Sequence, residues 1–61
     1  MTRNDAITAA RELSGLTFEE APVADANECN NGWDVLFWAS EADADNDDGA
    51  RALWRGTIAE N

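Results

Sequence analysis

The sequence predicts an α+β fold in which one N-terminal helix packs on a three-stranded antiparallel β-sheet, in the order αβββ. The prediction depends on an apolar stripe at helical spacing near the start of the chain and on two segments of alternating apolar residues near its end. Turn-forming residues separate these segments. At 61 residues, the chain predicts one small acidic domain covering residues 1–61.

Residues 4–14, NDAITAARELS, predict the helix. Asn4 is the predicted N-cap, and Asp5 places a negative charge at the N-terminal end of the helix dipole. Gly15 is the predicted C′ residue. Arg11 lies off the predicted apolar stripe. That stripe consists of Ala6, Ile7, Ala10 and Leu13.

Three further segments predict the sheet. Residues 16–24, LTFEEAPVA, predict a weaker first strand that ends near residue 21, because Pro22 cannot donate a ladder hydrogen bond. Residues 25–32, DANECNNG, carry turn-forming residues and predict a loop. Residues 33–40 and 51–58 are rich in aromatic and β-branched residues and predict the second and third strands. An Asp-Gly pair between them predicts a hairpin turn at residues 48–49.

Alternation divides the last two strands into two faces. The helix is predicted to cover the more apolar face, which consists of Trp33, Val35, Phe37, Trp54 and Ile58. One helix cannot cover both sides, so Leu36, Trp38 and Leu53 are predicted on an uncovered second face. Two interpretations of Trp38 stay open: an interface anchor, or a residue shielded by its neighbours with Arg55 stacked on its ring.

Charge is the strongest compositional signal. Thirteen acidic residues oppose four basic ones, all arginine, for a net charge of −9. Such a surface lacks the cations that displace counterions from phosphates, which excludes direct binding to nucleic acid or to an anionic membrane. No segment approaches the roughly 20 apolar residues of a membrane span, and the polar N-terminal segment is unlike a signal peptide. We therefore expect a cytoplasmic protein.

Catalytic and metal-binding signatures are missing from the sequence. It has no His, and its one cysteine, Cys29, excludes an intrachain disulfide and is interpreted as a small hydrophobe or an idle thiol. The acidic stretch fails as an EF-hand: with Asp43 at position 1, Asp48 stands where Gly belongs and Trp54 where a bidentate Glu belongs. The chain also has no Lys to activate a nucleophile. We expect no enzyme, catalytic residue, cofactor or specific metal site.

Five carboxylates lie within eight positions, residues 41–48. If this segment is extended, alternate side chains lie about 6.6 Å apart and form a ladder of like charges. A cationic groove built for nucleic acid responds to such a disposition of charge. The predicted partner is therefore a nucleic-acid-binding protein. The predicted partner-binding residues are Glu41, Asp43, Asp45, Asp47, Asp48, Glu19, Glu20, Asp34 and Trp38.

In size, acidity and its EADADNDDG segment, the chain resembles small phage-encoded inhibitors, above all the anti-CRISPR proteins, several of which are DNA mimics. The resemblance implies an inhibitor that occupies the DNA-binding groove of a CRISPR-Cas effector in the host-cell cytoplasm. A second resemblance, carried by the helix and by NNGWDVLFWAS, is to PepSY and cystatin-like small domains. It implies a structural likeness and no activity.

Solvation is the alternative explanation of the acidity. A protein working in concentrated salt tolerates many carboxylates because its charges are screened, and such proteins commonly avoid lysine. The chain has no lysine and has twelve alanines, as this alternative expects. The domain would then have a structural or dimerisation role, with a homodimer formed through the Leu36, Trp38 and Leu53 face.

Overall fold

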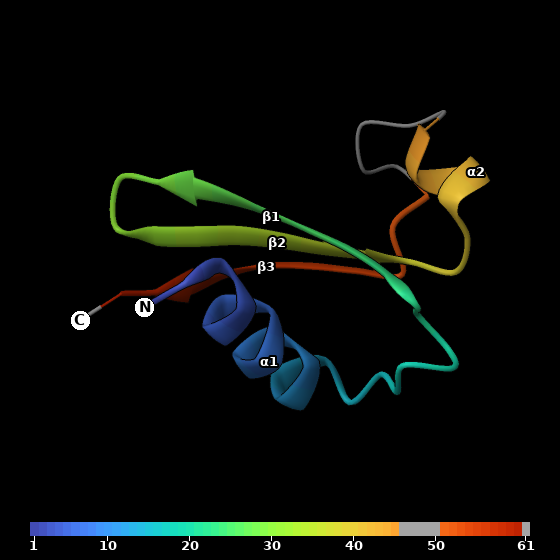
Figure 1. The fold of residues 1–61 in the computed structure, drawn as a ribbon, viewed down its shortest axis with the longest axis horizontal. Helices are drawn as coiled ribbons and strands as arrows, with labels where there is room; N and C mark the ends of the chain where they lie inside the picture. The colour runs from blue at the N-terminus through green and yellow to red at the C-terminus, as the bar shows by residue number, and fades with distance from the viewer. Residues whose placement is uncertain (46–50, 61) are drawn as a thin grey trace.

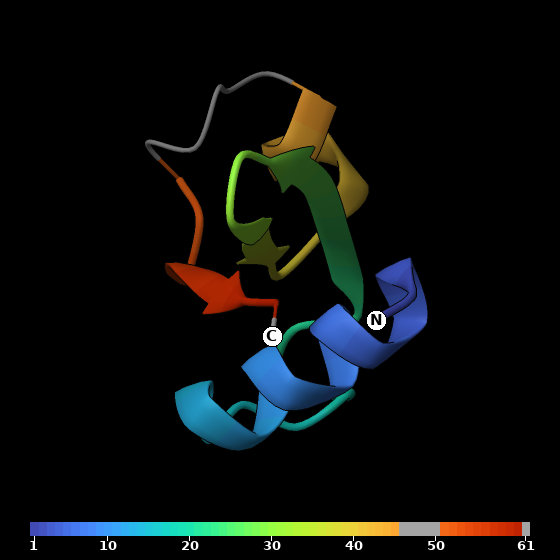
Figure 2. The same cartoon turned by 90° about the vertical axis from the view of Figure 1, so that its left-hand side faces the viewer.

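The computed structural model describes residues 1–45 and 51–60. Its elements are helix α1 (Arg3–Ser14), strands β1 (Val23–Cys29) and β2 (Gly32–Trp38), the short helix α2 (Glu41–Asp45) and strand β3 (Trp54–Ala59). The strands form one antiparallel sheet in the order β1-β2-β3, and α1 lies against one face (Figure 1). Figure 2 shows α2 on the opposite side. The predicted α+β fold is confirmed.

Helix α1 begins one residue earlier than predicted because Thr2, and not Asn4, is its N-cap. The Thr2 hydroxyl accepts a hydrogen bond from the Asp5 backbone N–H at 3.1 Å, and the Asp5 carboxylate accepts one from the Thr2 N–H at 3.1 Å. This reciprocal capping box satisfies two N–H groups that the helix itself cannot. Gly15 ends the helix as predicted, with a φ of 72° and its N–H bonded to the Arg11 carbonyl.

The face that α1 buries contains three of the four residues of the predicted stripe, Ala6, Ile7 and Ala10, but not Leu13. Ala6 and Ala10 are fully buried, whereas Leu13 is 71% exposed. The small alanines let the helix approach the sheet closely. Arg11, predicted to lie off the stripe, instead reaches the core, with its guanidinium carbon 4.6 Å from the centroid of the Phe37 ring. The predicted place of Leu13 is therefore wrong.

The predicted strand at residues 16–24 is also wrong for most of its length. Residues 18–20 form a turn, in which the Ala21 N–H bonds to the Thr17 carbonyl at 3.0 Å. Thr17 and Glu20 exchange hydrogen bonds between side chain and backbone, so this backbone is satisfied locally and does not need a ladder. The first strand begins only after Pro22.

Strand β1 occupies most of the segment that was predicted as a loop. It pairs with β2 over its whole length, from Val23 opposite Trp38 to Cys29 opposite Gly32. Only residues 30 and 31 remain as the turn between the two strands. Pairing with the strongly β-forming β2 overrides the poor β propensity of Asp and Asn in β1.

The core lies between α1 and the sheet, on the face that the sequence predicts. It consists of Ala6, Ala10, Ala21, Ala26, Val35, Phe37 and Ile58. Trp33 and Trp54 are partly buried against it. The Trp54 ring lies over Gly56, where a Cβ would stand 2.5 Å from the ring atom Cη2. Glycine at this position therefore makes room for the indole.

The connection from β2 to β3 contains helix α2. Ser40 caps this helix, accepting the Asp43 backbone N–H on its Oγ at 3.3 Å and the Ala44 N–H on its carbonyl oxygen at 3.2 Å. The predicted Asp-Gly hairpin turn at residues 48–49 lies outside the described residues. Strand β3 begins at Trp54, three residues later than predicted, after the Leu53 N–H bonds to the Phe37 carbonyl at 2.7 Å.

Candidate protein-binding surface

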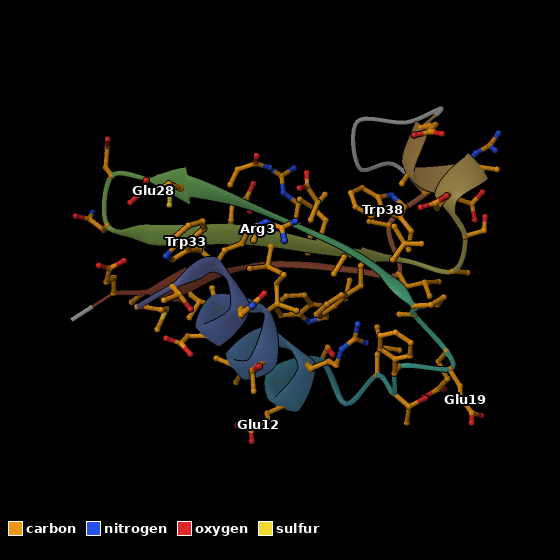
Figure 3. All side chains as sticks on the ribbon, viewed as in Figure 1. Arg3, Glu12, Glu19, Glu28, Trp33 and Trp38 are labelled. Atoms are coloured by element: carbon orange, nitrogen blue, oxygen red, sulfur yellow. The ribbon has the colours of Figure 1, made fainter. Side chains whose placement is uncertain are left out.

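The predicted acidic residues that the structure describes gather mainly at one end of the molecule. Glu41, Asp43 and Asp45 lie on α2, and Glu19 and Glu20 lie in the turn after α1. Figure 3 shows Glu19 at the same end of the long axis as α2, on the opposite side of the sheet. We call these five residues the acidic end. Asp47 and Asp48, also predicted to bind a partner, lie outside the described residues.

From Glu41 to Asp45, helix α2 replaces the extended ladder of charges predicted for this segment. The prediction is wrong because Ser40 caps the segment and starts a helical turn. On a helix, residues four apart share a face, so Glu41 and Asp45 project together. Asp43 projects elsewhere and forms an ion pair with Arg51, with a 3.7 Å distance between Oδ1 and Nη1.

The turn holds Glu20 in one place. Its Oε1 accepts hydrogen bonds from the Thr17 backbone N–H at 3.1 Å and from the Thr17 hydroxyl at 3.0 Å. Both bonds lower the pKa of Glu20 below its ordinary value, and the bond from the backbone N–H has the larger effect. The carboxylate is therefore charged at neutral pH. Its neighbour Glu19 is exposed.

Arginines neutralise the outer sheet face and not the acidic end as a whole. The Asp34 carboxylate lies 3.2 Å from Nη2 of Arg55, and the Asp25 carboxylate lies 3.6 Å from Nη2 of Arg3. Asp34, predicted as part of the anionic surface, is thus half of an ion pair. Four carboxylates of the acidic end have no cationic partner among residues 1–45 and 51–60, namely Glu19, Glu20, Glu41 and Asp45.

Arg11 was missed by the sequence interpretation. Its Nη1 donates to the carbonyl oxygens of Ala21 at 2.9 Å and Thr17 at 3.3 Å. Its guanidinium carbon lies 5.3 Å from the Phe18 ring centroid, in addition to its contact with Phe37. Arg11 therefore fixes the turn that carries Glu19 and Glu20. Its positive charge contacts these carbonyl oxygens and aromatic rings.

Trp38 was predicted on an uncovered face, and this is wrong. The side chain is only 5% exposed, and α2 packs against β2 on this side, with Ala44 and Trp38 lining one pocket. Its Nε1 has no hydrogen-bond partner in the described part of the chain. Leu36 is also buried, whereas Leu53 is half exposed. Arg55 pairs with Asp34, and the stacking on aromatic rings found among the described residues comes from Arg11.

Two negative findings concern the described residues. In ranges 1–45 and 51–60, no group of three or more His, Cys, Asp or Glu side chains is placed to hold a metal ion. Neither described helix is long and apolar enough to cross a membrane. Cys29 is an exposed free thiol near the β1–β2 turn.

Comparisons with protein families, with curated protein sequences and with solved structures find no match to this chain.

Proposed function

We propose that this protein is an acidic protein-binding module that inhibits a nucleic-acid-binding protein by occupying its cationic groove in place of DNA. The observation that carries the proposal is the acidic end, where Glu19, Glu20, Glu41 and Asp45 have no cationic partner among the described residues. A net charge of −9 attracts a cationic groove at long range and raises the rate of encounter.

Local hydrogen bonds support the proposal because they order the acidic end before any partner arrives. Ser40 caps α2, and the exchange between Thr17 and Glu20 closes the turn on the other side of the sheet. Side chains on ordered backbone lose less conformational entropy on binding than side chains on a flexible tail. The carboxylates of the acidic end are then presented to a cationic groove at fixed positions. The phosphates of a DNA backbone are also presented to such a groove at fixed positions.

The proposed target is a CRISPR-Cas effector in the cytoplasm of a host cell. The resemblance to anti-CRISPR proteins in size, acidity and lack of catalytic apparatus directs the proposal to this class. The protein would bind the effector and not the nucleic acid, because its own charge repels phosphates.

A gel-shift competition between the effector, its DNA and this protein tests the proposal. The test variant is Glu41→Gln with Asp45→Asn, which removes two charges of the acidic end that have no cationic partner among residues 1–45 and 51–60. The matched control is Glu12→Gln with Glu28→Gln, which removes two charges from α1 and from the far end of the sheet (Figure 3). We expect the test variant to compete about three- to tenfold less well than the parent. This loss corresponds to the summed binding free energies of two exposed charge contacts.

The control variant should compete within about twofold of the parent, because Glu12 and Glu28 lie outside the acidic end and most of the net charge that speeds encounter remains. Equal competition by the test variant and the parent would show that the acidic end is only solvated surface. Failure of the parent to displace DNA from any CRISPR-Cas effector would reject that target class.

Solvation in concentrated salt is the second candidate, and the absence of lysine favours it. In this case the carboxylates bind water and ions, and the domain has a structural role. Thermal unfolding at low and high salt distinguishes the two candidates, because a chain adapted to brine unfolds when its charges are no longer screened.

A further inference from the structure

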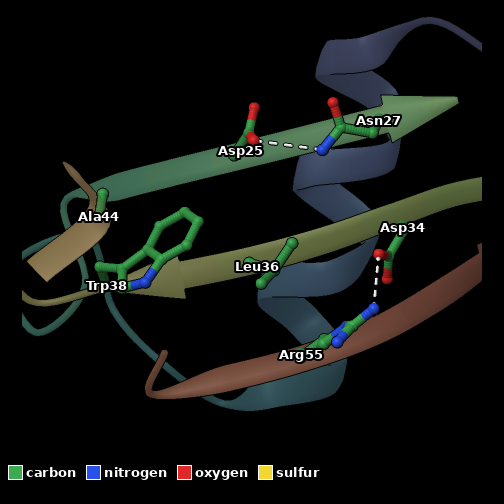
Figure 4. Close-up of a pocket in the computed structure, with 7 residues that line it drawn as sticks. All are labelled: Asp25, Asn27, Asp34, Leu36, Trp38, Ala44 and Arg55. Carbon is green, nitrogen blue, oxygen red and sulfur yellow. Dashed lines mark hydrogen bonds and ion pairs between the residues drawn. The ribbon is translucent and has the colours of Figure 1, made fainter. Parts of the chain in front are cut away.

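The outer face of the sheet carries a pocket beside α2. It has a volume of about 300 Å³ and opens beside α2, with side chains from all three strands around it (Figure 4). Leu36 and the Trp38 indole supply its apolar surface, and both are more than nine-tenths buried. This volume is at the lower end for ligand pockets and suits one side chain.

Two carboxylates flank the apolar part of the pocket. Asp25 on β1 is directly opposite Leu36 in the strand register, and Asp34 precedes Leu36 by two residues on β2. Side chains in these relations point to the same face of the sheet, about 5–7 Å apart. An occupant therefore meets an apolar floor between two negative groups.

Asn27 orients the carboxylate of Asp25 through a hydrogen bond. Its side-chain N–H donates to Oδ2 of Asp25 at 3.2 Å, which leaves Oδ1 for the ion pair with Arg3 at 3.6 Å. The other carboxylate, Asp34, is held by Arg55 at 3.2 Å. The Arg3 and Arg55 side chains are 51% and 62% exposed, and exposed ion pairs of this kind are weak and exchange readily.

We infer that this pocket receives an arginine side chain of the partner protein, in place of the cations that Arg3 and Arg55 supply in the free molecule. The apolar stem would lie along the Trp38 indole and Leu36, and the planar guanidinium would donate to the carboxylates beyond them. The pocket adjoins α2, so a cationic groove on the acidic end brings its arginines within reach. The inference rests on the proposed function in taking the partner to be a cationic protein.

Titration of the isotope-labelled full chain with N-acetyl-arginine methylamide, followed by NMR at constant ionic strength, tests the inference. The matched neutral probe is the citrulline analogue, which has the same shape without the charge. The indole N–H signal of Trp38 reports on the pocket, and that of Trp33, which donates to Glu60 at 3.2 Å, serves as an internal reference. We expect saturable shifts at Trp38 and Leu36 with a dissociation constant on the order of 1–10 mM, and none with citrulline.

Pocket variants should change the affinity in opposite directions. Asp34→Asn should weaken binding at least threefold, roughly the worth of one exposed charge contact. Arg55→Gln should strengthen binding by up to about fivefold, because it removes the resident competitor. Arg51→Gln removes the same charge outside the pocket lining and should leave the affinity within about twofold, because exposed charges at a distance are screened. Retained dispersion of the backbone spectrum verifies that each variant is folded.

Three outcomes would overturn the inference: no shift at Trp38 with the arginine probe, equal shifts with citrulline, or weaker binding by Arg55→Gln. None of them touches the acidic end, which the competition with DNA tests separately. Conversely, arginine binding in the pocket would stand if the Glu41 and Asp45 variant competed as well as the parent.

Discussion

The guanidinium carbon of Arg11 lies 4.6 Å from the centroid of the buried Phe37 ring. This contact joins the last turn of α1 to β2 near the C-terminal end of that strand. From the same position, Nη1 of Arg11 bonds to the carbonyl oxygens of Thr17 and Ala21. One side chain therefore ties the helix, the sheet and the turn that carries Glu19 and Glu20.

Replacing Arg11 by Lys should destabilise the fold by about 1–3 kcal/mol. Lysine keeps the charge but cannot stack a planar group on Phe37 while donating to two carbonyl oxygens. The measurement is the free energy of unfolding in urea. Arg3→Lys, at an exposed ion pair, is the control and should change stability by less than about 0.5 kcal/mol. Equal effects of the two substitutions would contradict a structural role for Arg11.

Replacing Gly56 by Ala should destabilise the fold by about 1–3 kcal/mol through overpacking. The added Cβ would stand 2.5 Å from the Trp54 ring, which would have to leave its place beside Phe37, 5.8 Å away between ring centroids. Chemical denaturation of the single and double variants with Trp54→Leu gives the coupling. In the Trp54→Leu background, Gly56→Ala should cost much less. A cost that is the same in both backgrounds would place the strain elsewhere.

The helix and the two later strands could be predicted because their signals are local and agree. Alternating aromatic and β-branched residues predict β2 and β3, and Gly15 marks the end of α1. Strand β1 could not be predicted. Its outward residues Asp25 and Asn27 are typical of turns, and it is a strand because β2 supplies a paired edge. Tertiary pairing here overrides local preference.

The sequence predicts which acidic residues belong to the candidate site, but it does not predict how they are arranged in space. The alternation of Ala with acidic residues at 41–45 fits an extended chain or a helix equally well, and the Ser40 cap decides for a helix. Strand alternation correctly places Trp38 on the outer face, but it cannot show that α2 returns over that face. The pocket beside Leu36 is lined in part by Asp25 and Asn27 of β1. Because this strand was not predicted, the pocket was not predicted either.

Acid should remove the stabilisation that Asp5 contributes. Hydrogen bonds from the backbone N–H of Thr2 and then from its side chain lower the pKa of Asp5 below its ordinary value of 3.8. A carboxylate whose pKa is lower in the folded state stabilises the fold above the unfolded-state pKa, and this contribution fades as the pH falls through the folded-state pKa. The parent should therefore be more stable than Asp5→Asn at neutral pH, with the gap closing below about pH 4.

Thermal unfolding of both proteins between neutral pH and about pH 2 measures this gap. Glu12→Gln, on the same helix but outside the capping box, controls for the loss of one negative charge. The difference between the two variants isolates the cap from the general relief of repulsion that acid brings to a chain of net charge −9. A gap that persists unchanged at the acid end would show that the Asp5 carboxylate does not stabilise the helix through its charge.

Salt dependence of stability separates mimicry from adaptation to brine. At about 0.15 M salt the Debye length is about 8 Å, and at about 1 M it falls to about 3 Å, which screens repulsion among the surface carboxylates.

A binding module has to fold at the lower salt concentration, since it must present its acidic end to a partner there. The capping box of α1, the core around Phe37 and the Arg11 contacts do not depend on high salt, so we expect a cooperative thermal transition in dilute buffer. Added salt should raise the midpoint only modestly, because it screens the repulsion and also weakens the exposed pairs of Arg3, Arg51 and Arg55. A chain that is unfolded at about 0.15 M and folds only above about 1 M would count against inhibition by mimicry and in favour of solvation.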